Sequence, residues 1–146
     1  GFDRPNIKLT VEMRHNGSQQ LLAFLQQHIG ESGIATASQQ EDGKSQLQKV
    51  AQTLQEISTE FPTDLEWILR IDGHTDERPI QSERFASNWE LSTARAISVV
   101  KFFLSQGVDP KRLAAAGFGS THPITEKKTE KAYRQNRRIE IKLTQH

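Results

Sequence analysis

The sequence predicts a two-layer α+β sandwich, in which a mixed sheet of about four strands carries its helices on one face. Apolar residues alternate with polar ones in several short segments, which is the pattern of half-buried strands. Between these segments apolar residues recur at helical spacing, and glycine or proline ends each run. Because predicted strands and helices alternate along the chain, each helix can pack its apolar stripe against the same sheet.

Composition limits the classes of function. The chain has 146 residues, 34% hydrophobic and 25% charged, as expected for one globular domain with a modest core. The 19 Lys and Arg residues oppose 18 Asp and Glu residues, so a net charge of +1 gives no long-range attraction to nucleic acid or an anionic membrane. The lack of cysteine excludes disulfides, thiolate metal sites and cysteine nucleophiles, and leaves the cellular compartment open.

The ends of the sequence suggest part of a longer protein. No apolar run approaches the roughly 20 residues that span a bilayer. The chain begins Gly1-Phe2-Asp3, which is typical neither of a signal peptide nor of a native start. We therefore expect any membrane anchor to lie upstream.

The first forty residues are predicted to form an extension with a strand and a short helix. The strand is indicated by alternating apolar residues, which are Ile7, Leu9, Val11 and Met13. Apolar residues at helical spacing predict a helix over residues 19–29, before Gly30. Residues 31–43 are small and polar, which indicates a loop or a weak strand. This extension, residues 1–40, could be a linker or a dimer region.

A second helix and a strand follow, and they begin the main domain, residues 41–146. The helix is predicted by a continuous apolar stripe, which is Leu47, Val50, Ala51, Leu54, Ile57 and Phe61. Pro62 ends this run. Leu65, Trp67, Leu69 and Ile71 then predict a strand covered on much of both faces. The strand delivers residues 72–76 to one edge of the sheet.

The remaining elements are a long helix, two strands and a short helix. Ser87 and Glu90 form a capping-box pattern at the start of the long helix. Its predicted apolar stripe is Leu91, Ala94, Ile97, Val100 and Leu104, and Gly107 is the expected stop. Residues 113–118 and 139–143 are predicted strands, and the charged segment 126–136 between them can hold a short helix.

A carboxylate and a guanidinium are predicted to meet at one rim of this fold. Asp76 follows a strand and a turn in which Gly73 would permit a positive φ. Arg95 lies about one turn inside the capped helix, whose N-terminus favours anions. Arg95 also comes four residues after Leu91, so it should lie at the margin of the core. Together the two charges suit a ligand that carries both an ammonium and a carboxylate.

Several motifs follow one another in an order that resembles a known family. They are Gly73-His74-Thr75-Asp76, Asn88 with Leu91-Ser92, Arg95-Ala96, Gly107, Gly117-Phe118-Gly119 with Pro123, and Asn136-Arg137-Arg138-Ile139-Glu140. This combination, over roughly residues 43–143, resembles the OmpA-like C-terminal domain. The spelling Ser87-Asn88-Trp89-Glu90-Leu91-Ser92 and the long loop over residues 77–87 are most similar to flagellar stator proteins of the MotB group. The strand that usually precedes the family's first helix is weak here, over residues 33–37.

The resemblance implies non-catalytic binding of bacterial peptidoglycan through the diaminopimelate of its stem peptide. The family's aspartate and arginine correspond to Asp76 and Arg95. Further family contacts correspond to Thr75, Asn88, Leu91 and either Arg137 or Arg138. No catalytic residue, cofactor or metal is implied. The resemblance also implies a periplasmic domain of an inner-membrane-anchored protein, a homodimer at full length, a membrane channel partner upstream and no nucleic-acid ligand.

Several alternatives remain open at this stage. Asp72, Asp76 and Glu77 could form an acid/base pair of a peptidoglycan-modifying hydrolase, although no nucleophile or oxyanion hole accompanies them. The loop over residues 77–87, or the N-terminal helix, could instead contact a regulatory partner.

Four further features of the sequence have two readings each. His74 could bind a metal or hydrogen-bond its turn, and we favour the turn because no other histidine has ligand spacing. The basic residues of segment 127–138 alternate with or flank Glu126, Glu130 and Glu140, which is typical of a solvated face rather than a nucleic-acid site. Trp67 could stack on a sugar ring, but it is expected in the core because its strand is covered. Trp89 is expected to pack beside the helix start, with stacking on a sugar ring as the alternative.

Overall fold

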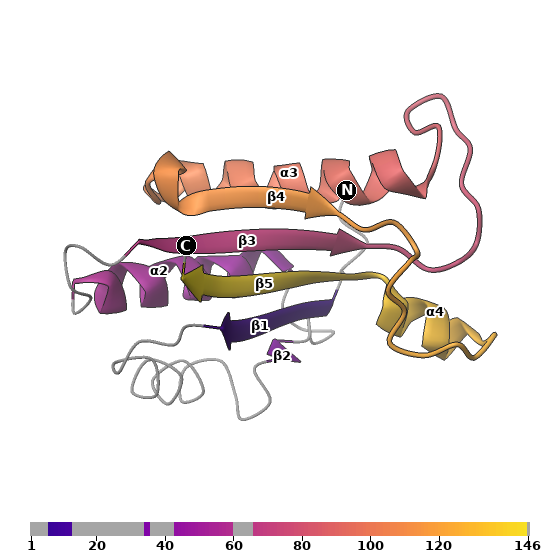
Figure 1. Ribbon diagram of the computed structural model, residues 1–146, viewed down its shortest axis with the longest axis horizontal. Coiled ribbons are helices and arrows are strands. Elements are labelled where there is room, and N and C mark those ends of the chain that lie inside the picture. The colour runs from indigo at the N-terminus through magenta and orange to yellow at the C-terminus, as the bar shows by residue number, and fades with distance from the viewer. Residues whose placement is uncertain (1–5, 13–33, 36–42, 60–65, 146) are drawn as a thin grey trace.

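The computed structural model describes residues 6–12, 34–35, 43–59 and 66–145, which form a mixed five-stranded sheet with helices on one face (Figure 1). The strands are β1 (Asn6–Glu12), β2 (Ile34–Ala35), β3 (Trp67–His74), β4 (Leu113–Gly117) and β5 (Arg138–Gln145). The described helices are α2 (Gly43–Ser58), α3 (Asn88–Ser105), α4 (Glu130–Asn136) and the 3-10 turn η1 (Pro110–Arg112). The predicted two-layer α+β class is confirmed, with one strand more than expected because β2 adds a two-residue edge.

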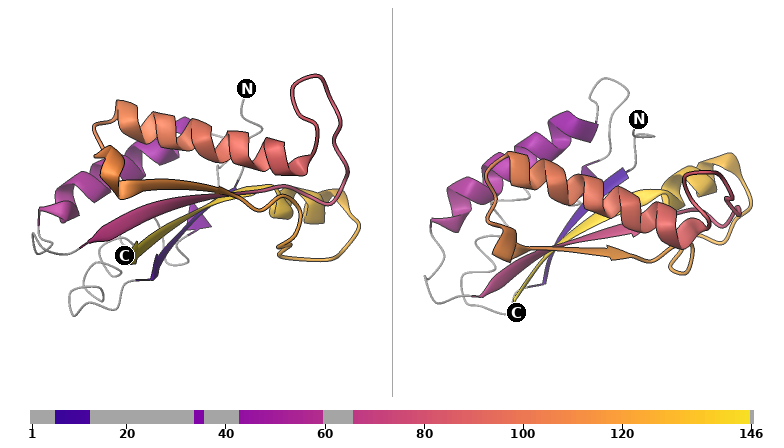
Figure 2. Two further views of the ribbon diagram at one scale, coloured as in Figure 1. Left: turned by 45° about the horizontal axis from the view of Figure 1, so that its top comes forward. Right: turned by 90° about the horizontal axis from the view of Figure 1, so that it is seen from above.

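The order of strands in the sheet is β2-β1-β5-β3-β4. β3 and β4 are parallel and are joined through α3, whereas β5 runs antiparallel between β3 and its parallel neighbour β1. Figure 2 shows that α2 and α3 both cover one face, while α4 lies beyond the end of the sheet. The C-terminal ends of β3 and β4 therefore meet the start of β5 at the edge where α3 begins.

The N-terminal strand belongs to this sheet. β1 lies where the alternation predicted a strand and pairs with β5 over its whole length, from Asn6 opposite Arg138 to Glu12 opposite Thr144. The helix predicted over residues 19–29 lies outside the described residues. The division of the chain near residue 40 stays a prediction.

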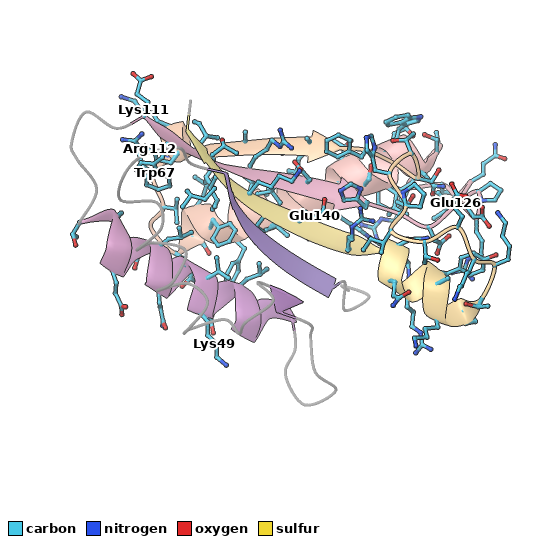
Figure 3. All side chains as sticks on the ribbon, turned by 60° about the horizontal axis from the view of Figure 1, so that its bottom comes forward. Lys49, Trp67, Lys111, Arg112, Glu126 and Glu140 are labelled. Carbon is cyan, nitrogen blue, oxygen red and sulfur yellow. The ribbon has the colours of Figure 1, made fainter. Side chains whose placement is uncertain are left out.

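The first helix layer follows its predicted apolar stripe. The side chains of α2 that are buried in the core are Leu47, Val50, Ala51 and Leu54. They meet the inward residues of the central strands, which are Leu69, Ile71, Ile139, Ile141 and Leu143. Ile57 and Phe61 fall outside the described side chains. At the end of the sheet away from α4, the core is closed by Trp67, and the guanidinium carbon of Arg112 lies 5.0 Å from its ring centre (Figure 3).

The buried face of α3 differs from the predicted one. The side chains that it buries are Ser92, Ala96, Val99 and Phe103, whereas Ile97 and Leu104 of the predicted stripe are each 41% exposed. The predicted face was wrong because α3 has apolar residues at helical spacing on more than one face, and the face that is buried begins with Ser92, a small polar residue with no exposed surface. Its hydroxyl accepts a hydrogen bond from the backbone N–H of Gly119 and donates one to the carbonyl of Trp89.

Two glycines let α3 approach the sheet closely. A Cβ atom at Gly73 would lie 2.1 Å from the carbonyl oxygen of Ser92, and one at Gly117 would lie 2.0 Å from Oγ1 of Thr93. Gly73 therefore serves close packing rather than a positive φ, and the strand continues through it to His74. Because the first turns of α3 rest directly on strand backbone, the start of this helix is fixed against the end of β3.

Three other predictions concern ends of elements. Ser87 caps α3 as expected, although its hydroxyl accepts from the N–H of Trp89 and contacts the carboxylate of Glu90 directly. Gly107 follows the end of α3 with a φ of 91°. The short charged helix appears as α4, capped by the hydroxyl of Thr129. Within the part of the chain that the structure describes, no helix is long and apolar enough to cross a bilayer.

Candidate functional site

A pocket lies where β3 ends, α3 begins and α4 passes into β5. Its volume is about 220 Å³. The residues that line it are Thr75, Asp76, Arg78, Pro79, Ile80, Asn88, Leu91, Arg95 and Arg137. Six of the seven residues predicted to bind ligand are therefore brought together from distant parts of the sequence. The lining contains three arginines and one carboxylate, so a ligand with at least one carboxylate is favoured electrostatically.

Asp76 is the one acid of this lining, and it is held by two arginines. Its Oδ1 accepts from the backbone N–H of Arg78 at 2.9 Å and from Nε of Arg78 at 3.2 Å. Its Oδ2 accepts from Nη2 of Arg78 at 2.8 Å and from Nη1 of Arg137 at 2.6 Å. Burial alone would raise the pKa of this carboxyl, but the hydrogen bonds from Arg78 and Arg137 outweigh burial and lower the pKa below its usual value. Asp76 is therefore ionised at neutral pH.

Arg78 is a pocket residue that the sequence did not single out. Its guanidinium carbon lies 4.5 Å from the ring centre of Tyr133, and its Nη1 lies 3.2 Å from Oε1 of Glu130. The ion pair with Asp76 raises the pKa of Arg78 above its ordinary value. The only available signal was the charge two residues after Asp76, in a loop whose path could not be read from the sequence.

The backbone around Asp76 is fixed by the neighbouring polar residues of the motif. The N–H of Thr75 donates to the carbonyl of Gly119 at 2.9 Å, and its hydroxyl donates to the carbonyl of Asp76 at 3.0 Å. The side-chain amide of Asn88 donates to the carbonyls of Asp76, at 3.4 Å, and Arg78, at 3.1 Å. Thr75 and Asn88 therefore tie the loop after β3 to the β4 end and to the first residue of α3.

Leu91 and Arg95 enter the pocket from α3. They are four residues apart, so both lie on the same face of the helix, one turn above the other. Leu91 is half-buried and supplies an apolar wall, while Arg95 brings a guanidinium to the same space as Asp76. The meeting of Asp76 and Arg95 in one pocket is the arrangement that the motifs predicted.

The two arginines of the Asn136-Arg137-Arg138 motif lie in different places. Arg137, just before β5, lines the pocket and binds Asp76. Arg138 does not line it. Its side chain lies on the sheet face opposite α2 and α3, where it donates to the carbonyls of His122, at 2.7 Å, and Asn136, at 3.1 Å. Asn136 is buried, and its side chain binds the backbone of Ile124 and Thr125, which fixes the loop before α4.

The sheet face opposite the helices carries a second set of charged residues. Nε2 of His74 lies 2.9 Å from Oε2 of Glu140, and Nε of Arg138 lies 3.4 Å from Oε1 of the same residue. The hydrogen bond from His74, with the charge of Arg138, overcomes burial and lowers the pKa of Glu140 to about 2. Glu140 projects from β5 near the middle of the sheet (Figure 3).

His74 is packed between an acid and an aromatic ring. Its ring stacks on Phe118 with centres 5.1 Å apart and planes 6° apart, and the ring of His122 lies 6.3 Å away. Nothing in the sequence indicated that His74 and His122 are neighbours. In the described residues, no three His, Cys, Asp or Glu side chains lie close enough together to hold a metal ion.

The three carboxylates considered for an acid/base pair, Asp72, Asp76 and Glu77, have different surroundings. Asp72 faces the side of the sheet opposite the helices and receives two hydrogen bonds from Arg70, at 2.8 and 2.9 Å. Glu77 pairs with Lys128, outside the pocket lining. Asp76 is left with a lowered pKa, whereas a general acid at neutral pH needs a raised one. This geometry does not favour a hydrolase.

The fold and the motif order define a member of the OmpA family. That family matches the sequence over residues 40–137, which is more than half of the chain, so the chain belongs to it. Among curated relatives, motility protein B of Helicobacter pylori strain J99 is 37% identical over 73 residues, which cover 50% of this chain and 28% of that protein. The peptidoglycan-associated lipoprotein of Pseudomonas aeruginosa is 35% identical over 72 residues, which cover 49% of this chain and 40% of that protein.

A solved structure of the same family has a similar fold. The crystal structure of the periplasmic domain of Helicobacter pylori MotB, residues 78–256, superposes with a TM-score of 0.61 and 27% sequence identity. The match covers 75% of this chain and 68% of that structure. The chain spans less than half of the length of the two curated relatives above, so it corresponds to one part of each.

Proposed function

We propose that this chain binds bacterial peptidoglycan without catalysis and holds the free end of diaminopimelate in the pocket between β3 and α3. The observation that carries the proposal is the presence of Asp76 and Arg95 in one pocket of about 220 Å³. The free end of diaminopimelate bears an ammonium and a carboxylate on one carbon. Asp76 is the complement of the ammonium, and Arg95 is the complement of the carboxylate.

The relatives support the polymer as ligand. One of them is named for its association with peptidoglycan, and the ordered motifs of this chain resemble the same family. Charge-assisted hydrogen bonds contribute about 1.5–3 kcal/mol each, and less where water screens them, so one pocket should bind weakly. Weak sites suffice on a polymer mesh, because attachment at several points multiplies modest affinities.

We extend the proposal to the whole protein from which the chain comes. A match to the periplasmic domain of MotB supports a periplasmic part of a longer membrane-anchored protein that tethers a complex to the cell wall. At full length it would form a homodimer and join a membrane channel partner. A full-length sequence without an upstream membrane-spanning segment, or a monomeric full-length protein, would remove this extension and leave the pocket proposal intact.

Co-sedimentation with isolated peptidoglycan tests the binding proposal. The unmodified protein should pellet with the polymer, and Asp76→Ala and Arg95→Ala should each remain in the supernatant while keeping the circular dichroism spectrum of the folded protein. Arg84→Ala is the matched control, since Arg84 is exposed, stacks on Phe85 and does not line the pocket. Unchanged pelleting of both pocket variants would refute the assignment of the site, and release of soluble muropeptides would replace it with the hydrolase alternative.

A further inference from the structure

We propose that Arg78 competes with the ammonium group of the ligand for the carboxylate of Asp76, so that diaminopimelate binds Asp76 by displacing the Arg78 side chain. This inference rests on the proposed function and adds to it a residue that decides affinity. Asp76 has the role of ammonium acceptor in that function, yet in this structure its carboxylate is already occupied by Arg78 and Arg137.

The acceptor capacity of Asp76 is the first part of the argument. An ionised carboxylate has about four lone-pair positions for hydrogen bonds. Asp76 receives four N–H donors, three from Arg78 and one from Arg137. A ligand ammonium placed against Asp76 would therefore have to replace at least one of these donors. It would also meet the positive charge of the guanidinium that it replaces.

Arg78 is the donor that can leave. Its side chain is 46% exposed, whereas that of Arg137 is 22% exposed. Two of its contacts do not involve Asp76, namely Nη1 with Glu130 and the guanidinium face with Tyr133. Rotation of the Arg78 side chain off Asp76 can therefore keep its charge beside an acid and its plane over a ring.

The loop need not move in this exchange. The backbone of Arg78 is held at both polar groups, because its N–H donates to Asp76 and its carbonyl accepts from the amide of Asn88. After displacement, Asp76 would keep the backbone N–H of Arg78 and Nη1 of Arg137, and the ammonium would take the two positions that the guanidinium had used. One cation replaces another, so the charge around Asp76 is conserved.

This exchange gives the site a selectivity. A ligand with an ammonium group can replace the guanidinium at Asp76, whereas a ligand with carboxylates alone cannot. The measured affinity is then the difference between two cation–carboxylate pairs. An arginine at position 78 therefore weakens each individual attachment, which suits a protein that binds a polymer at several points.

Calorimetric titration with a soluble disaccharide-tetrapeptide that contains diaminopimelate tests the inference. Since the Arg78 side of the ion pair is 46% exposed, water screens it and makes it a weak competitor, so Arg78→Gln should bind this muropeptide about two- to fivefold more tightly than the unmodified protein. Arg84→Gln removes the same charge from the same loop without touching Asp76 and should leave the affinity unchanged. In ¹⁵N spectra of the unmodified protein, the Nε–H signal of Arg78 should shift on saturation with the muropeptide.

The outcomes separate this inference from the proposed function. Equal or weaker binding by Arg78→Gln, with the unmodified protein still binding, overturns the role of Arg78 and leaves the peptidoglycan site standing. An unshifted Arg78 Nε–H signal at saturation has the same meaning. If neither protein binds the muropeptide or pellets with peptidoglycan, the proposed function fails and the inference fails with it.

Discussion

Asp76 and Glu140 are two carboxylates of the same molecule, each held by two nitrogen-bearing side chains, but the surroundings of those side chains differ. The partners of Glu140, His74 and Arg138, have side chains that are 3% and 6% exposed. The main partner of Asp76 is 46% exposed and lines a pocket. The presence of an ion pair therefore says little about its role. The exposure of its partners decides whether the carboxylate can exchange them for a ligand.

This comparison predicts that Glu140→Gln acts on stability and not on binding. The variant should lower the free energy of unfolding at pH 7 by about 3 kcal/mol, because a pKa of about 2 in place of 4.5 corresponds to roughly that difference. Urea unfolding measures the effect, and muropeptide binding at low urea should be unchanged. A loss of binding with no loss of stability would reverse the roles assigned to the two carboxylates.

The same group fixes the direction of the pH dependence. Since the folded-state pKa of Glu140 is depressed, its contribution is fully present above its ordinary value of 4.5 and is lost as the pH falls towards about 2. The unmodified protein should lose stability across this window, and Glu140→Gln should lose less. Urea unfolding at several pH values between 7 and 2 measures both slopes, and parallel slopes would contradict the assignment.

Gly73→Ala should lower both the stability of the protein and its binding of peptidoglycan, and so should not separate the two effects as the carboxylate variants do. The added Cβ would lie 2.1 Å from the carbonyl oxygen of Ser92, so the start of α3 must move away from β3. Overpacking of this kind costs about 1–3 kcal/mol. Binding should fall as well, since Asn88, Leu91 and Arg95 move with the helix. Urea unfolding and co-sedimentation measure the two effects.

Gly107→Ala is the control for this substitution. Gly107 has a φ of 91° and follows the opposite end of α3 from the pocket, so an alanine there is strained but distant from Asp76. This variant should lose stability and keep its affinity for peptidoglycan. Equal loss of binding by both glycine variants would show that general destabilisation, rather than the position of the helix start, limits binding.

Asp76→Asn should weaken ligand binding and leave stability almost unchanged, which is the reverse of the effect expected for Glu140→Gln. Ligand binding should weaken about ten- to hundredfold, because a charge-assisted hydrogen bond to the ammonium is lost. The free energy of unfolding should change by less than about 1 kcal/mol, since Arg78 can turn to solvent and the side-chain oxygen of an asparagine can still accept from Arg137. Calorimetry and urea unfolding measure the two quantities. A large loss of stability would mean that Asp76 is structural, like Glu140.

Much of the fold was predictable because it depends on large apolar residues. Alternation located β1, β3 and β5, and the stripe of α2 identified its buried face. The face of α3 was missed because this helix has apolar residues at helical spacing on more than one face, and the start of its buried face is Ser92, which rests on two glycines and carries no apolar signal. Close packing of small residues is decided by three-dimensional fit, which spacing along the sequence does not record.

Most residues of the candidate site could be predicted from the sequence, but the ion pairs between them could not. The motif order selected six of the nine residues that line the pocket, including Arg137, and missed Arg78, Pro79 and Ile80. Alternation along β5 could have removed Arg138, because Ile139 faces the core and its neighbours in the strand must face the other way. The occupation of Asp76 by Arg78 depends on the conformation of the loop after β3, which no local pattern specified.

The smallest predicted effect concerns Ser87, the cap of α3. Ser87 contacts neither Asp76 nor Glu140, but it holds the helix start that positions Asp76. Ser87→Ala removes the hydroxyl that accepts from the N–H of Trp89, and loss of such a cap costs about 1 kcal/mol. Because Asn88 is the first residue of the helix and ties it to the carbonyl of Asp76, fraying there should also weaken muropeptide binding slightly. Ser105→Ala, at the other end of α3, removes a comparable hydroxyl contact and should leave binding unchanged. If both serine variants bound equally well, the helix start would be held by the glycine contacts alone, and the cap would contribute to stability without contributing to the pocket.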